Sequence, residues 1–147
     1  MSSQPELIPG GVSSDDRGRV YFANGLDLSH CRRFYFVENF SVGTVRAWHA
    51  HRNERKWVLA VSGAALACCV EIDNWESPST DTDVHRFVLD ASNPSVLSVP
   101  AGYANGAMSL VPQTKLLYLS DASLDASLDD DIRYPARYWD PWDVAER

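Results

Sequence analysis

The sequence predicts an all-β protein built as a single sandwich or barrel. Short runs rich in β-branched and aromatic residues recur at roughly ten-residue spacing, and turns that contain Gly or Pro separate them. No segment before Asp121 has the apolar period of a helix. The chain has 147 residues, of which 45% are hydrophobic, so we expect residues 1–147 to form one domain around one core.

The predicted strands follow one another along the chain. The aromatic and β-branched run at residues 33–37 opens the series, and the run at 56–61 ends at a Ser62-Gly63 turn. Residues 66–72 are almost continuously apolar, as a buried strand would be. The remaining predicted strands are residues 84–89, 96–99, 108–111 and 115–119.

The two ends of the chain differ from this centre. Residues 1–14 are polar at the start and rich in Pro and Gly, so we expect them to be flexible, and they lack the features of a signal peptide. Residues 121–147 form a C-terminal extension, whose acidic first part suits a turn of helix or a mobile segment. The aromatic residues that follow predict packing against the barrel or against a neighbouring subunit.

Composition narrows the classes of function. The net charge of −7 argues against nonspecific binding to nucleic acid. No apolar stretch approaches the length that crosses a membrane, and we expect a soluble, cytoplasmic protein. The 3 cysteines, of which Cys68 and Cys69 are adjacent, predict neither a disulfide framework nor a CxxC metal site.

Two short motifs carry the residues suited to chemistry. His49 and His51 are two positions apart, so on a strand both side chains face the same side. Glu54 follows them, and Pro100-Ala101-Gly102 precedes Asn105, which a facing strand would deliver to the same place. This arrangement resembles the two motifs of the cupins, in which the later position is a histidine, and it implies a cupin-type jelly-roll barrel.

A closer resemblance spans residues 16–139. The chain is similar to the dTDP-4-dehydrorhamnose 3,5-epimerases and to the dTDP-4-keto-6-deoxyhexose 3,4-ketoisomerases. The segments similar to the epimerases are Asp16-Arg17-Gly18, Val45-Arg46-Ala47-Trp48-His49, Lys56, Val99-Pro100-Ala101-Gly102-Tyr103-Ala104-Asn105-Gly106 and Leu116-Leu117-Tyr118. The segments similar to the ketoisomerases are Arg33-Phe34-Tyr35-Phe36-Val37, His49-Ala50-His51-Arg52 and Asp131-Ile132-Arg133-Tyr134.

The resemblance implies an isomerase of nucleotide-linked 4-keto-6-deoxysugars, working in deoxysugar and polysaccharide biosynthesis. A base removes a proton next to the keto group, and the return of a proton epimerises that carbon or moves the ketone. Such an enzyme needs neither a metal nor a redox cofactor, and a homodimer is expected.

Roles for individual residues follow from the same resemblance. His49 would be the general base, Tyr118 the acid on the opposite side, and Lys56 with Arg46 would stabilise the enolate or hold the pyrophosphate. Four further residues would bind the substrate. Arg17 would contact the nucleotide phosphate, His51 and Asn105 would hold the sugar or orient His49, and Trp48 would provide a platform for the base or the sugar.

Two departures from the family pattern leave alternatives open. Asn105 replaces a histidine, and the carboxylate that pairs with the catalytic histidine has no assigned counterpart, with Glu71 and Asp131 as candidates. One alternative is a metal-dependent cupin that uses His49, His51 and Glu54 as ligands. The other alternative is a noncatalytic cupin that binds a sugar nucleotide.

Overall fold

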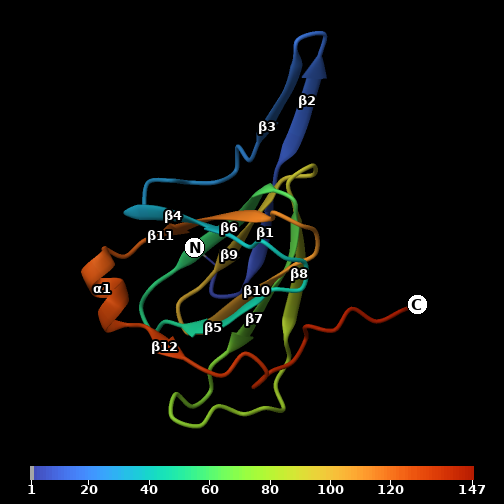
Figure 1. Cartoon of the computed structure of the whole chain (residues 1–147). Helices are drawn as coiled ribbons and strands as arrows, with labels where there is room; N and C mark the ends of the chain where they lie inside the picture. Colours follow the sequence, from blue (N-terminus) through green and yellow to red (C-terminus); the bar gives the residue numbers. More distant parts are fainter. Residues whose placement is uncertain (1) are drawn as a thin grey trace.

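Residues 2–147, which the computed structural model describes, fold into two packed sheets with one short helix (Figure 1). The elements are β1 (Glu6–Pro9), β2 (Gly11–Asp15), β3 (Gly18–Phe22), β4 (Arg33–Glu38), β5 (Val45–Ala50), β6 (Lys56–Ser62), β7 (Ala64–Glu71), β8 (His85–Asp90), β9 (Ser95–Val99), β10 (Tyr103–Ser109), β11 (Lys115–Ser120), α1 (Leu124–Asp129) and β12 (Ile132–Arg133).

The two sheets have five strands each and consist of antiparallel pairs. The first sheet has the order β1-β9-β6-β11-β4, and the second has the order β12-β5-β10-β7-β8. Strands β2 and β3 pair only with each other, as a hairpin that projects from the barrel (Figure 1). This arrangement confirms the predicted all-β, jelly-roll class of fold.

The main core lies between the two sheets. It takes inward-facing residues from both of them, with Val58, Leu97 and Leu116 on one side and Ala65 and Leu89 on the other. A second apolar cluster covers the outer face of the second sheet, where Trp139 and Trp142 of the C-terminal segment pack. Strand β7 is therefore buried on both faces, which explains the continuous apolar run that the sequence shows there.

Two parts of the fold correct or shift what the sequence predicted. Residues 1–14, expected to be flexible, contain β1, which pairs with β9, and most of β2. The sequence shows no clear strand signal there, because Pro9, Gly10 and Gly11 interrupt the run. The strand predicted at 108–111 instead spans Tyr103–Ser109. Its first half gives no strand signal in the sequence, because small residues are needed where it packs against β5. A side chain at Gly106 would place its Cβ 2.5 Å from the Cβ of Ala47 on β5.

No helix within residues 2–147 is long and apolar enough to cross a membrane.

Candidate active site

Six of the eight predicted site residues meet in one cavity of about 250 Å³ between the sheets. The cavity is closed on one side by α1 and by the segment that enters β12, which contribute Ser127, Leu128, Asp131 and Arg133. The predicted residues that line it are Arg46, His49, His51, Lys56, Asn105 and Tyr118. The structure therefore brings together residues that span much of the sequence.

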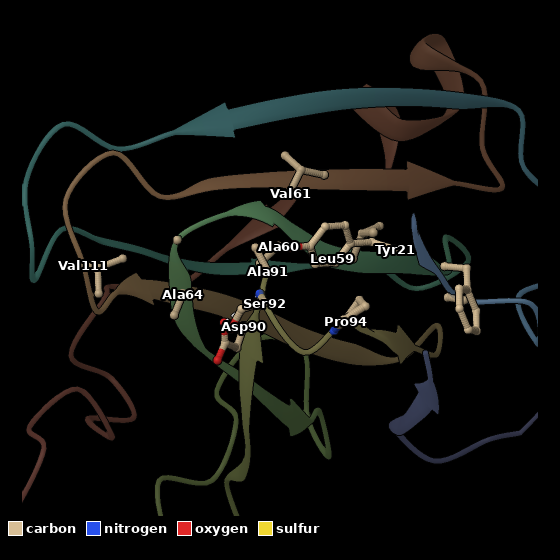
Figure 2. A pocket seen from close by; sticks show the side chains of 13 residues that line it. Tyr21, Leu59, Ala60, Val61, Ala64, Asp90, Ala91, Ser92, Pro94 and Val111 are labelled. Atoms are coloured by element: carbon tan, nitrogen blue, oxygen red, sulfur yellow. Dashed lines mark hydrogen bonds between the residues drawn. The ribbon is translucent and has the colours of Figure 1, made fainter. Parts of the chain in front are cut away.

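A larger cavity of about 770 Å³ lies elsewhere, beside the outer face of the first sheet (Figure 2). Leu59, Val61 and Val111 line it, together with Tyr21 of the projecting hairpin, and Asp90 is its only acidic or basic lining residue. Because the larger cavity offers no histidine and no cation, the smaller cavity is the candidate active site.

Strand β5 supplies Arg46 and His49 to the site, and His51 follows directly after the strand. His49 and His51 face the cavity by simple alternation. Arg46 joins them, although it is three positions before His49, because the pairing of β5 with β10 shifts register between Asn105 and Ala107. The Arg46 Nε donates a hydrogen bond to Asn39 Oδ1 at 2.7 Å, which anchors the guanidinium.

Trp48 is not a substrate platform, which corrects the expectation from sequence. It directly precedes the inward-facing His49 and therefore points to the outer face of its sheet. There its side chain is fully buried, and its indole Nε1 donates to the carbonyl oxygens of Ala136 and Trp139, both at 3.1 Å. Trp48 consequently anchors the C-terminal segment.

Arg17 does not reach the cavity within one chain. It lies at the turn of the β2–β3 hairpin, where its side chain is 86% exposed. Its Nε donates to Asp15 Oδ2 at 3.1 Å. The predicted contact between Arg17 and a nucleotide phosphate therefore requires a hairpin from another copy of the chain.

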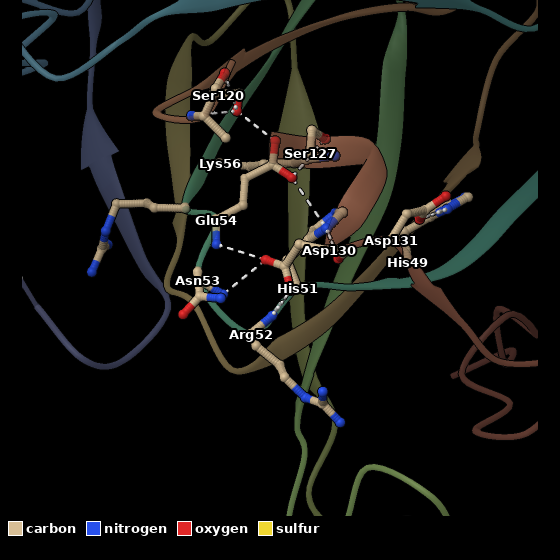
Figure 3. Close-up of polar contacts among 12 residues, drawn as sticks. His49, His51, Arg52, Asn53, Glu54, Lys56, Ser120, Ser127, Asp130 and Asp131 are labelled. Carbon is tan, nitrogen blue, oxygen red and sulfur yellow. Dashed lines mark hydrogen bonds and ion pairs between the residues drawn. The ribbon is translucent and has the colours of Figure 1, made fainter. Parts of the chain in front are cut away.

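His49 lies beside a carboxylate, and that carboxylate is Asp131. The two side chains approach with His49 Nδ1 and Asp131 Oδ1 3.8 Å apart (Figure 3). The pairing of β12 with β5 sets Arg133 opposite His49 and so brings Asp131 close. Asp131 also accepts from Arg133 Nε at 3.0 Å. Glu71, the other candidate, is exposed at the end of β7.

The electrostatics of the site keep His49 neutral near neutral pH. Burial lowers the pKa of His49, and the positive charge of Arg133 lowers it further, while Asp131 opposes both. A neutral imidazole is the form that can accept a proton from carbon.

The wall opposite β5 is formed by two stacked tyrosines. The rings of Tyr35 and Tyr118 lie parallel, with centroids 5.1 Å apart, and Lys56 Nζ donates to Tyr35 Oη at 2.9 Å. Burial raises the pKa of Tyr118, so its hydroxyl keeps its proton and can act as a donor. Lys56 is buried, with an exposed fraction of only 7%.

Asn105 has a structural contact as well as a place in the cavity. Its Nδ2 donates to the His49 carbonyl oxygen at 3.1 Å, which ties β10 to the backbone of the predicted base. Its side chain therefore lines the cavity but makes no hydrogen bond to the His49 ring.

The sequence did not predict the surroundings of Glu54. The motifs suggest it only as a metal ligand, yet its carboxylate lies beside His51 and accepts hydrogen bonds from Ser120 and Ser127 (Figure 3). It also accepts a hydrogen bond from Arg33. Its oxygens are thus occupied by protein donors and do not suit the metal-dependent alternative. Within residues 2–147, no cluster of three or more His, Cys, Asp or Glu side chains could hold a metal ion.

The profile of the dTDP-4-dehydrorhamnose 3,5-epimerase family matches residues 13–139. The chain belongs to this family. The resemblance inferred from the sequence motifs is thereby confirmed, and the chain is placed among enzymes that isomerise dTDP-sugars.

Solved structures share the fold of this family member. An epimerase of this name from Bacillus anthracis, with TDP and pyrophosphate bound, is 24% identical; the match covers 98% of this chain and 87% of that one, with a TM-score of 0.75. The QdtA 3,4-ketoisomerase from Thermoanaerobacterium thermosaccharolyticum is 17% identical over 95% of this chain and 94% of that one, with a TM-score of 0.68.

A third structure represents another reaction. The ChmJ 3'-monoepimerase from Streptomyces bikiniensis is 21% identical over 81% of this chain and 64% of that one, with a TM-score of 0.67. No curated protein matches the sequence. The fold of this family member is thus shared with enzymes named for three different isomerisations.

Proposed function

We propose that this chain isomerises a dTDP-linked 4-keto-6-deoxysugar by proton transfer next to the keto group. The observation that carries the proposal is the convergence on one cavity of a neutral histidine, its carboxylate and two cations, the buried Lys56 and the exposed Arg46. His49 removes the proton, and the electron pair moves to the keto oxygen as an enolate. Lys56 and Arg46, which line the same cavity, stabilise this oxyanion or hold the pyrophosphate.

The fate of the enolate decides between two reactions. Tyr118 supports epimerisation, because its protonated hydroxyl can return a proton from another side of the sugar. A 3,4-ketoisomerisation needs a hydroxyl proton to move between neighbouring oxygens of an enediol, and His51 favours this second candidate. Its side chain lines the cavity, and its Nε2 is buried with no hydrogen-bond partner among the described residues.

Proton exchange in D₂O tests the proposed reaction. The purified protein is incubated with dTDP-4-keto-6-deoxyglucose in D₂O and followed by ¹H NMR. We expect loss of the C3 proton signal, and the product identifies the reaction as a new epimer or a 3-ketosugar. If no ring proton exchanges and no new ketosugar forms, the substrate assignment is wrong.

We further propose that the working form is a homodimer built on the outer face of the first sheet. Phe34 and Phe36 of β4 point outward there with 64% and 54% of their surface exposed. They continue across β11 to Leu117 and Leu119 as one apolar surface beside the projecting hairpin. A second copy suits this surface, because its own hairpin could then bring Arg17 towards the neighbouring cavity.

A further inference from the structure

His51 is held by two oxygens on one side of its ring. Its Nδ1 lies 2.7 Å from the Asp130 carbonyl oxygen and 3.1 Å from Glu54 Oε2. Both of these atoms only accept hydrogen bonds, since Glu54 is charged, so Nδ1 must carry a hydrogen. The other ring nitrogen, Nε2, then bears the lone pair. It is buried without a protein partner, and His51 lines the cavity.

Glu54 is a buried carboxylate held by donors on both of its oxygens. Its side chain is 1% exposed and takes hydrogen bonds from three different elements. Ser120 of β11 and Arg33 of β4 donate to Oε1, and Ser127 of α1 donates to Oε2 at 2.9 Å. Burial raises the pKa of Glu54, but the donation from Ser120 and the charges of Lys56 and His51 outweigh it and keep the group ionised.

We propose that Glu54 is a positioning residue that holds His51 with its Nε2 lone pair facing the substrate, ready to accept a hydrogen from a sugar hydroxyl. In the sequence, Glu54 follows His51 at a shorter spacing than the acidic residue of the cupin motif does. The role therefore rests on the contacts of Glu54 in this chain and not on the motif. The contact between Glu54 and His51 is a property of the protein alone and does not depend on the identity of the substrate. The hydroxyl contact rests on the proposed function.

The two histidines are thereby distinguished. The carboxylate oxygen nearest His51 Nδ1 is 3.1 Å away, whereas that nearest His49 Nδ1 is 3.8 Å away. Each carboxylate is also paired with an arginine, Glu54 with Arg33 and Asp131 with Arg133, so the distance to the ring is what separates the two pairs. His51 can thus form the better compensated imidazolium when it takes up a proton.

Several charged groups act on His51 from the elements around it. Burial lowers the pKa of His51, and Lys56 lowers it further, whereas Glu54 and Asp130 raise it. The groups that face it are Glu54 and Asp130 from the adjoining loops, Lys56 of β6, His49 of β5 and Asp131 before β12. Removing the charge of Glu54 should therefore make His51 titrate at lower pH.

Nitrogen-15 NMR of the substrate-free protein tests this role. In the wild type we expect His51 with hydrogen on Nδ1 and an unprotonated Nε2. Glu54→Gln should move the titration of His51 to lower pH, and the exposed Glu71→Gln should leave it unchanged. A wild-type His51 protonated on Nε2, or a titration that Glu54→Gln does not move, would overturn the proposal. The wild-type tautomer decides even if the variant does not fold.

Kinetics then test the contact with substrate. Glu54→Gln should lower kcat by about 10- to 100-fold with a smaller change in KM, as for other partners that orient a working histidine. The acidic limb of its pH–rate profile should also move to lower pH. A variant with a shifted His51 titration but unchanged kcat would contradict the role of His51 in turnover. Inactivity of the wild type would instead fail the proposed function and leave the NMR result standing.

Discussion

At His49, three influences set how well the side chain can act as a base. Burial and Arg133 both lower its pKa, and Asp131 partly restores it. Asp131 has a double effect, because it pairs with Arg133 at 3.0 Å and so also reduces the effect of that cation on the ring. The pH dependence of kcat/KM reports the pKa of His49 that results from these three influences.

The first prediction at this scale concerns Asp131→Asn. Because the carboxylate raises the pKa of His49, its removal should move the acidic limb of the kcat/KM profile to lower pH. The limit of kcat at neutral pH should fall as well, since the imidazolium that forms loses its nearest negative charge. The measurement is the rate of product formation across the acidic pH range.

Asp129→Asn provides the matched control. Asp129 is exposed at the end of α1, two positions away from Asp131, and does not line the cavity. Its substitution should leave the profile in place. An acidic limb that stays put or moves to higher pH in Asp131→Asn would contradict the pairing of Asp131 with His49.

At the scale of elements, alternation along strands was the most productive signal. It predicts that His49, in β5, and His51, just after it, face the same side, and the continuous apolar character of β7 predicts its burial. The same alternation, applied to Trp48, would have turned it away from the cavity. Its assignment as a platform followed the motif instead and was wrong.

What the sequence could not provide were contacts between distant segments. Asp130 accepts from the backbone nitrogens of Arg52, Asn53 and Glu54, which fixes the loop after β5. A run of aspartates gives no sign of which one will do this. The pairing of Asp131 with His49 likewise depends on β12, whose 2 residues are too short for any periodic pattern.

The C-terminal aromatics show why that short strand stays in place. Trp139 Nε1 donates to the Ser79 carbonyl oxygen at 2.9 Å, and the Tyr134 hydroxyl donates to that of Trp75 at 2.7 Å. These bonds tie the segment after β12 to the long loop between β7 and β8. The sequence predicted that the aromatics would pack, but left open whether the surface belonged to the barrel or to a neighbouring subunit.

At the scale of the whole molecule, the outer face of the first sheet exposes large apolar side chains, among them Phe34 and Phe36. A dimer through this face predicts that Phe36→Glu gives a monomer, because a charge would be buried at the interface. Sedimentation velocity measures the mass. Val88→Glu is the control, since Val88 is also exposed, at 57%, but lies on β8 of the other sheet.

The outcome bears on Arg17 as well. If the partner's hairpin completes the site, monomeric Phe36→Glu should bind dTDP more weakly than Val88→Glu does. A wild-type protein that is monomeric at micromolar concentration would contradict the dimer, and Arg17 would then have no route to the phosphates. The cavity around His49 would be unaffected by that result.

The central claim is that His49 takes the proton from the carbon next to the keto group. The most direct measurement compares His49→Asn with the wild type for exchange of the substrate's C3 proton in D₂O. We expect exchange to fall by about 10²- to 10⁴-fold, the usual contribution of a general base, while the affinity for dTDP measured by calorimetry stays similar. A folded His49→Asn protein that exchanges the proton at the wild-type rate would contradict the claim.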